Sequence, residues 1–282
     1  MPQTFRTACV QNCAGPDMAA NIAEAERLAI QAATDGADLI CLPEFFSCLD
    51  VGPERFEVGA TDEENHPALP VFTRLARDYH AWILLGSLAV KTASGKIRNR
   101  SILIDSGGAI VSRYDKIHLF DVDLAGGENY RESLTVEAGE KAVLAPTPWG
   151  LMGLTVCYDL RFAHLYRTMA QAGAMFFTVP AAFTMTTGKA HWHPLLRARA
   201  IETGSFVFAP CQWGRHGKAE TYGHSLIIDP WGVVLADGGE ADGIIVVEID
   251  PDRVATARAM IPALLHDRPY AGPEPATIER TG

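Results

Sequence analysis

Short runs of β-branched and aromatic residues alternate along the chain with longer segments in which apolar residues recur every three or four positions. In the amino-terminal part, the runs over residues 5–11, 38–42 and 81–90 predict strands. The segments over residues 19–33 and 70–79 have helical spacing and predict helices. This β-α-β-α-β order favours neighbouring strands joined by helical crossovers.

The carboxyl-terminal part continues the alternation and adds hairpins. Residues 101–105 and 109–113 flank a Ser-Gly-Gly turn, and residues 222–229 and 233–235 flank an Asp-Pro-Trp-Gly turn, so each pair predicts a hairpin. The other predicted elements are strands over residues 151–156, 175–179, 205–210 and 243–249 and helices over residues 162–172 and 194–202.

No linker rich in Pro, Gly or Ser divides this series of elements. We therefore predict one α/β domain over residues 1–270, in which two sheets are covered by helices on their outer faces, a four-layer α-β-β-α sandwich. Residues 271–282 form a tail without periodicity, and two interpretations stay open for it: it wraps around a neighbour or it is loose.

The composition limits the kinds of binding partner and the cellular compartment that we expect. With 24 Lys and Arg against 34 Asp and Glu, the net charge of −10 repels phosphate backbones, so we expect neither nucleic acid nor anionic membrane as a partner. The 6 cysteines show no repeated C-x-x-C pairing, which predicts neither a disulfide framework nor a zinc ribbon. The amino terminus lacks the features of a secretory signal, so a cytoplasmic location is expected.

Cys157 follows the apolar run 151–156 and precedes a predicted helix. A strand-to-helix turn places a thiol beside free backbone N–H groups, which favour the thiolate and bind an oxyanion. A buried structural cysteine is the alternative interpretation, and it is the one we assign to the other cysteines.

Two charged residues also fall at the ends of predicted strands, and a third, Glu132, follows a Gly-containing loop. Glu44 precedes two phenylalanines, and a carboxylate that loses hydration there suits general acid or base catalysis; a capping or ion-paired role is the alternative. Lys116 is flanked by apolar residues, and a fixed ammonium stabilises charge on a carbonyl oxygen, although taken alone a solvated lysine fits as well. Glu132 taken alone fits a surface residue. Strand ends of open α/β folds converge on one edge, where such side chains meet.

Several motifs in the same order resemble the nitrilase superfamily of carbon–nitrogen hydrolases. They are LPEFF at 42–46, YDKIHLFDVD at 114–123, RES at 131–133 and CYDLRF at 157–162. Further stretches resemble the branch of small amidases that contains deaminated glutathione amidase and omega-amidase; they are TGKAHW at 187–192, LLRARAIE at 195–202 and TYGHS at 221–225. The similarity extends from residue 5 to about residue 268.

The resemblance implies the four-layer sandwich and a role for each matching position. Cys157 is then the nucleophile, Glu44 the general base, Lys116 the cation that stabilises the tetrahedral intermediate, and Glu132 a second carboxylate that orients Lys116 or the substrate. The backbone N–H of Tyr158 would share the oxyanion. The implied reaction is cofactor-free hydrolysis of a small carboxyamide through a thioester, with release of ammonia.

The substrate is expected to be deaminated glutathione, with 2-oxoglutaramate as the second choice. Arg161 could pair with a substrate carboxylate, or instead with Asp159 or another acid of the chain. Phe183, Thr184 and Thr187 occupy a segment that lines the pocket in relatives. The alternatives are an N-carbamoyl amine or a nitrile as substrate, or a binding module without catalysis.

The segment before Pro194 departs from what the resemblance implies. His193-Pro194 stands where relatives often carry an acidic and then an apolar residue, which puts the local pocket wall or a subunit contact in doubt. We expect no metal at His191-Trp192-His193, since these residues fall at a predicted helix start with Pro194 as the first helical residue. The family further implies a homodimer or a higher homo-oligomer.

Overall fold

Two six-stranded sheets packed face to face form the centre of the protein. The computed structural model describes residues 3–52, 56–124 and 128–273. The first sheet contains, in spatial order, β18 (Gly243–Ile249), β1 (Phe5–Gln11), β2 (Leu39–Cys41), β5 (Trp82–Lys91), β6 (Ile97–Ile104) and β7 (Ile110–Asp115). The second contains β10 (Val143–Thr147), β11 (Gly150–Leu154), β12 (Ala174–Thr178), β13 (Phe206–Ala209), β16 (Leu226–Ile228) and β17 (Val234–Asp237).

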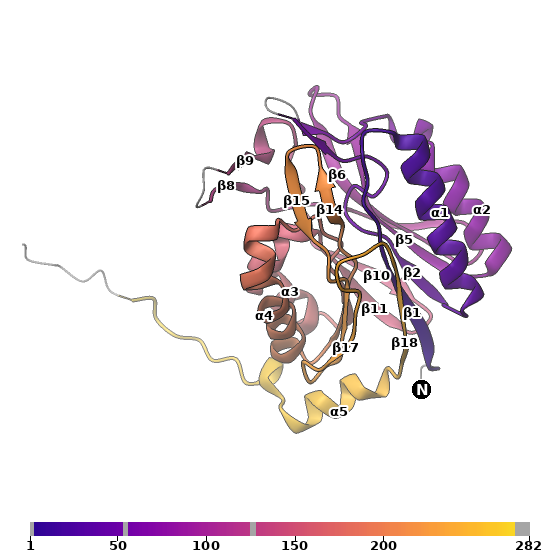
Figure 1. Cartoon of the computed structure of the whole chain (residues 1–282). Coiled ribbons are helices and arrows are strands. Elements are labelled where there is room, and N and C mark those ends of the chain that lie inside the picture. Colours follow the sequence, from indigo (N-terminus) through magenta and orange to yellow (C-terminus); the bar gives the residue numbers. More distant parts are fainter. Residues whose placement is uncertain (1–2, 53–55, 125–127, 274–282) are drawn as a thin grey trace, which may run out of the picture.

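Helices cover the outer face of each sheet, as Figure 1 shows for α1 and α2 on one side and α3 and α4 on the other. Their bounds are Met18–Thr34 for α1, Ala68–Tyr79 for α2, Ala163–Gln171 for α3 and Met185–Thr203 for α4. The predicted four-layer α-β-β-α sandwich is confirmed. A further helix, α5 (Asp252–Met260), follows β18.

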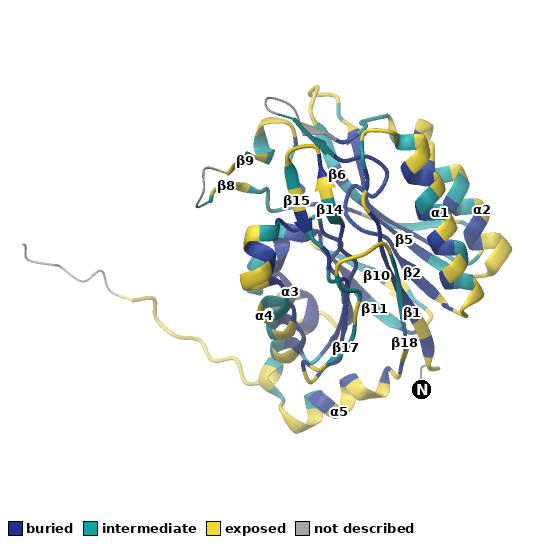
Figure 2. Cartoon of the chain, in the orientation of Figure 1, coloured by how far each residue is buried: buried dark blue, intermediate teal, exposed yellow. Residues whose placement is uncertain are grey.

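The inner strands, such as β1, β2, β5, β12 and β13, are buried on both faces, which explains their nearly continuous apolar sequences. In β1, Phe5 and Cys9 point into the core between the two sheets, whereas Ala8 and Val10 point into the core beneath α1 and α2. Figure 2 shows dark, buried strands between helices whose outer faces are exposed. Phe5, at the start of β1, stacks on Trp149, in the turn between β10 and β11, with ring centroids 4.1 Å apart, so this pair joins the two sheets.

The parallel strands are those joined by helical crossovers, β1–β2–β5 in one sheet and β11–β12–β13 in the other. Both predicted hairpins are present, as β6–β7 and β16–β17. The shorter strands are β3 (Asp50–Val51), β4 (Phe56–Glu57), β8 (Asp121–Asp123), β9 (Asn129–Arg131), β14 (Trp213–His216) and β15 (Ala219–Tyr222), and they form three two-stranded ribbons.

The prediction that a helix begins at Pro194 is wrong. Helix α4 begins at Met185, and Thr184 caps it by accepting a hydrogen bond from the Thr187 N–H, so Pro194 lies inside the helix. The proline removes one interior hydrogen bond, a cost that the packing of α4 against the second sheet offsets. Figure 1 shows the chain running away from the body beyond α5, and the part of the predicted tail at 274–282 lies outside the described residues.

Within the described residues, none of the helices has both the length and the apolar character needed to cross a bilayer.

Candidate active site

The nucleophile candidate Cys157 lies three residues beyond the end of β11, at the first position of a short 3₁₀ helix, Cys157–Arg161. Its φ of 49° is in the left-handed region, a conformation that costs energy for a residue with a Cβ and that the surrounding structure must hold. Its N–H donates to the Pro180 carbonyl at 2.9 Å, and the Val156 N–H donates to Asp159 at 2.9 Å. These bonds fix the turn, so that the thiol reaches a cavity although the residue is 8% exposed.

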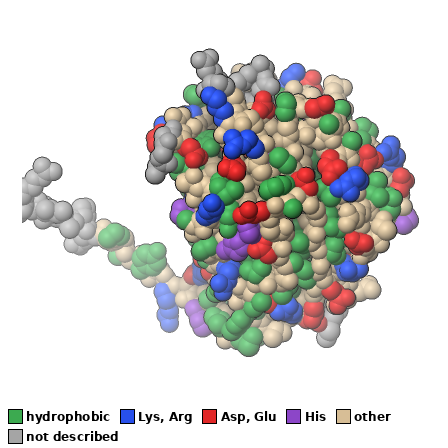
Figure 3. Space-filling model, in the orientation of Figure 1, with side chains coloured by type: hydrophobic (Ala, Val, Ile, Leu, Met, Phe, Trp, Pro, Cys, Tyr) green, Lys and Arg blue, Asp and Glu red, His purple; other side chains and the backbone are tan. Residues whose placement is uncertain are grey.

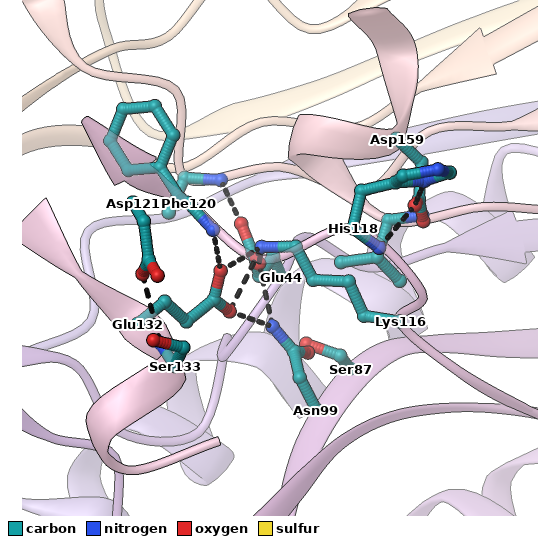
Figure 4. A network of polar contacts seen from close by, with 12 residues as sticks. Glu44, Ser87, Asn99, Lys116, His118, Phe120, Asp121, Glu132, Ser133 and Asp159 are labelled. Atoms are coloured by element: carbon teal, nitrogen blue, oxygen red, sulfur yellow. Dashed lines mark hydrogen bonds and ion pairs between the residues drawn. The ribbon is translucent and has the colours of Figure 1, made fainter. Parts of the chain in front are cut away.

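Lys116 directly follows β7 and is buried between two carboxylates (Figure 4). Its Nζ lies 3.0 Å from Oε1 of Glu44 and 2.9 Å from both carboxylate oxygens of Glu132. Burial lowers the pKa of Lys116, but the charges of Glu132 and Glu44 outweigh burial and raise that pKa well above its ordinary value. The lysine is therefore a permanent cation, and burial raises the pKa of Glu132.

Glu44 links this cation to the thiol. Its Oε2 accepts the Ala182 N–H at 2.8 Å, and its side chain is hydrogen-bonded to Cys157. Burial first and Glu44 second raise the pKa of the Cys157 thiol well above its ordinary value, while Lys116 opposes them. A backbone N–H, that of Ala182, favours the thiolate as expected, but burial and Glu44 outweigh it, and the thiol faces a carboxylate that can accept its proton.

Asn99 on β6 is a residue of the site that the sequence analysis missed. Its Nδ2 donates to Oε1 of Glu44 at 2.8 Å and to Oε1 of Glu132 at 3.2 Å, so one amide holds both carboxylates in place. The side chain is fully buried. Asparagine is depleted in strands, and β6 pairs with β5 on one side and with β7 on the other. A polar amide within such an inner strand is the sequence feature that could have identified Asn99.

A second network ties the lysine segment to the nucleophile turn. The buried carboxylate of Asp159 accepts the Tyr114 hydroxyl at 2.7 Å and the His118 N–H at 3.0 Å, in addition to the Val156 N–H. Figure 4 shows His118 and Asp159 on the far side of Lys116 from Glu132. Because His118 is two residues after Lys116, this carboxylate sets the spacing between cation and thiol.

The predicted catalytic residues share one cavity of about 350 Å³. Its lining includes Glu44, Lys116, Glu132 and Cys157, together with Tyr158, Phe183, Thr184 and Thr187 from the predicted substrate-binding set. Phe120, Tyr130 and Arg131 from the β8–β9 ribbon, and Glu220 and Thr221 from β15, complete much of the wall.

Arg161 does not line this cavity. Its guanidinium lies over the rings of Tyr158, at 5.7 Å, and of Phe183, at 5.4 Å, two residues that do line the cavity. The alternative pairing with Asp159 is absent as well, because Tyr114 and His118 occupy that carboxylate. The structure therefore assigns Arg161 to supporting two aromatic wall residues.

The carbon–nitrogen hydrolase family model matches residues 6–259. Deaminated glutathione amidase from Synechocystis sp. is 42% identical over 270 residues, which cover 93% of this chain and 97% of that protein. The Homo sapiens protein of the same name is 38% identical over 260 residues, which cover 90% of this chain and 79% of that protein.

Solved structures show the same architecture. The Caenorhabditis elegans NitFhit protein superposes with a TM-score of 0.85 at 34% identity, over 94% of this chain and 65% of that one. A mutant amidase from Nesterenkonia sp. AN1, with a TM-score of 0.74 at 25% identity over 91% of this chain and 95% of that one, carries an acetamide moiety added covalently at its active-site cysteine.

The fold and its buried thiol, carboxylates and ammonium define a hydrolase of carbon–nitrogen bonds other than peptide bonds. The chain belongs to the carbon–nitrogen hydrolase family and is an amidase of the nitrilase superfamily.

Proposed function

We propose that the protein hydrolyses the amide bond of deaminated glutathione, with Cys157 as nucleophile, Glu44 as general base and acid, and Lys116 as oxyanion stabiliser. The convergence of these three side chains at one cavity, from segments far apart in the sequence, carries the proposal. The similarity to proteins named deaminated glutathione amidase supports the choice of substrate.

In the first step, the Cys157 S–H proton moves to Glu44 as the sulfur adds to the amide carbon. The carbonyl oxygen acquires the negative charge, which the Lys116 ammonium and the Tyr158 N–H stabilise. Because the thiol is protonated at rest, transfer of its proton to Glu44 and attack by its sulfur are linked. Burial of the site strengthens the attraction between the negative oxygen and the Lys116 ammonium.

In the second step, the intermediate collapses and protonated Glu44 gives its proton to the departing nitrogen. A thioester remains on Cys157 until water, deprotonated by Glu44, attacks its carbonyl carbon, and the sulfur leaves and regains a proton. Release of ammonia, which the sequence analysis expected, fits a primary amide such as 2-oxoglutaramate. The amide nitrogen of deaminated glutathione belongs to a dipeptide, so the leaving amine there is the dipeptide.

Glu132 is proposed to orient Lys116 and not to exchange protons with the substrate. Both of its oxygens accept from Nζ, and one also accepts the Phe120 N–H at 2.6 Å, so its acceptor capacity is already used inside the protein. We propose that Thr184 and Thr187 donate hydroxyl hydrogen bonds to a 2-oxo acid, with Tyr158 and Phe183 forming the apolar wall.

The test is turnover of both amides by the purified protein. Deaminated glutathione should yield free dipeptide amine, and 2-oxoglutaramate should yield ammonia, while Cys157→Ala folds and releases neither. Hydrolysis of an N-carbamoyl amine or a nitrile in preference to both amides would move the protein to the alternative substrate classes. Ligand binding without turnover of any of them would favour a binding module instead.

We also propose that the protein is a homodimer or a higher homo-oligomer in a reducing cytoplasm. Ile201 on α4 is 54% exposed, and Trp231 and Val233 beside it are 51% and 50% exposed, an apolar surface that a second copy would bury. None of the six cysteines is in a disulfide, the usual state of cysteines in a reducing compartment. A monomeric mass in light scattering at micromolar concentration would contradict the assembly.

A further inference from the structure

Away from the catalytic cavity, two imidazoles and a carboxylate from three different elements meet. Nε2 of His193, on α4, lies 3.1 Å from Asp237 at the end of β17, and Nδ1 of His224, between β15 and β16, lies 2.9 Å from the other oxygen of Asp237. One nitrogen of each histidine and a carboxylate oxygen all lie within 4.8 Å of one another. Figure 3 shows histidine and acidic side chains side by side on this face.

The ring of His224 is held firmly. Its backbone has a φ of 51°, its N–H donates to the Gly239 carbonyl at 2.8 Å, and its carbonyl accepts the indole N–H of Trp192 at 2.7 Å. Tyr222 stacks on the imidazole with ring centroids 4.4 Å apart. The imidazole is therefore placed by the fold and needs little ordering to act as a ligand.

The charge of the cluster also favours a cation. Glu240 lies 3.7 Å from Nε2 of His224, the nitrogen that faces away from Asp237. Within residues 3–52, 56–124 and 128–273, neither Asp237 nor Glu240 forms an ion pair with a lysine or an arginine. A metal-bound imidazole commonly directs its second N–H to a carboxylate, and Glu240 stands where that partner belongs.

We propose that His193, His224 and Asp237 bind a divalent ion of borderline softness, Zn²⁺ by preference, with water as the fourth ligand. Two nitrogens and one carboxylate oxygen are a ligand set that zinc accepts. Binding replaces the hydrogen bonds to Asp237, with His193 keeping its proton on Nδ1 and His224 keeping its proton on Nε2 toward Glu240. The ligand atoms need to close to about 3.3 Å from one another around a tetrahedral ion.

This differs from the sequence-based expectation of no metal at the His191-Trp192-His193 triplet. That expectation considered only neighbours in sequence, whereas the partners of His193 come from residues far along the chain. The three residues do not line the catalytic cavity. The ion would join α4, which carries the cavity residue Thr187, to the β16–β17 hairpin, and its expected effect is on stability.

The experiment uses the full chain with Cys157→Ala, so that metal binding to the active-site thiol does not contribute. After chelator treatment, ZnCl₂ is titrated by calorimetry and CoCl₂ by absorption spectroscopy. We expect one site per chain, and a rise in Tm of about 4 °C at zinc concentrations a hundredfold above Kd. His193→Gln or Asp237→Asn should weaken binding at least tenfold, and Glu240→Gln should weaken it less.

His191→Gln, at an exposed position two residues before His193 on the same helix, is the matched control and should bind as the parent does. The proposal is overturned if the parent takes up no ion at millimolar zinc. It is equally overturned if His193→Gln and Asp237→Asn, folded by circular dichroism, bind as tightly as His191→Gln. Loss of amidase activity has no part in this readout, so the result stands apart from the proposed function.

Discussion

The Lys116 ammonium lies 2.9 Å from each carboxylate oxygen of Glu132, a pairing buried from solvent. A buried ammonium on a flexible four-carbon chain has no fixed position of its own, and the two oxygens supply one. The ammonium that is to stabilise the oxyanion is therefore placed before substrate arrives, so no reorganisation is needed at the moment of reaction.

Replacing Glu132 with Gln should remove this anchor and keep the shape of the side chain. We expect kcat to fall roughly a hundredfold, since a misplaced oxyanion donor typically costs that much, with the fold retained. Steady-state kinetics and circular dichroism check the result, with the exposed Glu140→Gln as control. Wild-type kcat in Glu132→Gln would show that Lys116 needs only Glu44.

Asn99 should act through the two carboxylates that it holds. Asn99→Ala removes both hydrogen bonds, and we expect kcat to fall roughly tenfold to a hundredfold while KM changes little, because Asn99 does not line the cavity. Asn99→Asp places a third buried carboxylate beside Glu44 and Glu132 and should lose more activity and stability than Ala. The reverse order, or a change confined to KM, would contradict a positioning role.

The raised pKa of the Cys157 thiol makes its reactivity depend on Glu44. Iodoacetamide should label Cys157 faster than the other thiols, including the exposed Cys13. Glu44→Gln removes one cause of the raised pKa of Cys157, and it also removes the group that accepts the thiol proton. We expect loss of the proton acceptor to have the larger effect, so that labelling of Cys157 becomes slower than labelling of Cys13. Peptide mapping by mass spectrometry follows both sites in one sample; uniform labelling of the wild-type thiols would contradict the assignment.

Much of the fold could be predicted because its signals are local. The strand over residues 5–11 has the predicted bounds, since its apolar residues report burial on both faces. The start of α4 could not be found by the same means, because Pro194 mimics a first helical residue and only tertiary packing shows that it is interior. At Pro194 the low helix propensity of proline is outweighed by the tertiary contacts of the whole helix.

The site residues also differ in whether local sequence could predict them. Glu44, Lys116 and Cys157 stand at strand ends within motifs, so both position and resemblance pointed to them. Asn99 and the partners of Asp159 lie within or beside strands, and their roles depend on side chains that approach from distant segments. Arg161 lies outside the cavity lining, which its spacing from the nucleophile in sequence could not show.

Stability should depend on pH through Glu63, which joins two arginines on the β6–β7 hairpin. Burial raises the pKa of Glu63, but hydrogen bonds from Arg100 and Arg113 outweigh it and lower the pKa below its ordinary 4.5. A lowered folded-state pKa stabilises the protein above the unfolded-state value, and this contribution is lost as pH falls through the folded-state value.

Glu63→Gln should therefore reduce the free energy of unfolding by roughly 1 kcal/mol at pH 7, and the difference from wild type should shrink below about pH 4. Urea unfolding at several pH values measures it. A difference that stays constant through the acidic range would mean that the charge of Glu63 is not its source.

Substitutions of Arg131 and of Arg161 should distinguish binding of the substrate from support of the cavity wall. Among the described residues, the lysine and arginine side chains that line the cavity are Lys116 and Arg131. Its present partner, Asp123, is 73% exposed, so that pair costs little to exchange for a substrate carboxylate. Arg131→Ala should raise KM for deaminated glutathione at least tenfold, the usual loss for a charged hydrogen bond, and leave kcat nearly unchanged.

Arg161→Ala should instead lower kcat by less than tenfold and leave KM close to wild type, since it removes the cation–π contacts with Tyr158 and Phe183 and a contact with His191, all outside the cavity lining. A neutral amide without a carboxylate sharpens the comparison, because its KM should be insensitive to Arg131→Ala. If Arg161→Ala alone raised KM for the charged substrate, Arg161 would be the carboxylate ligand, and its guanidinium would have to leave the rings of Tyr158 and Phe183 and enter the cavity during binding.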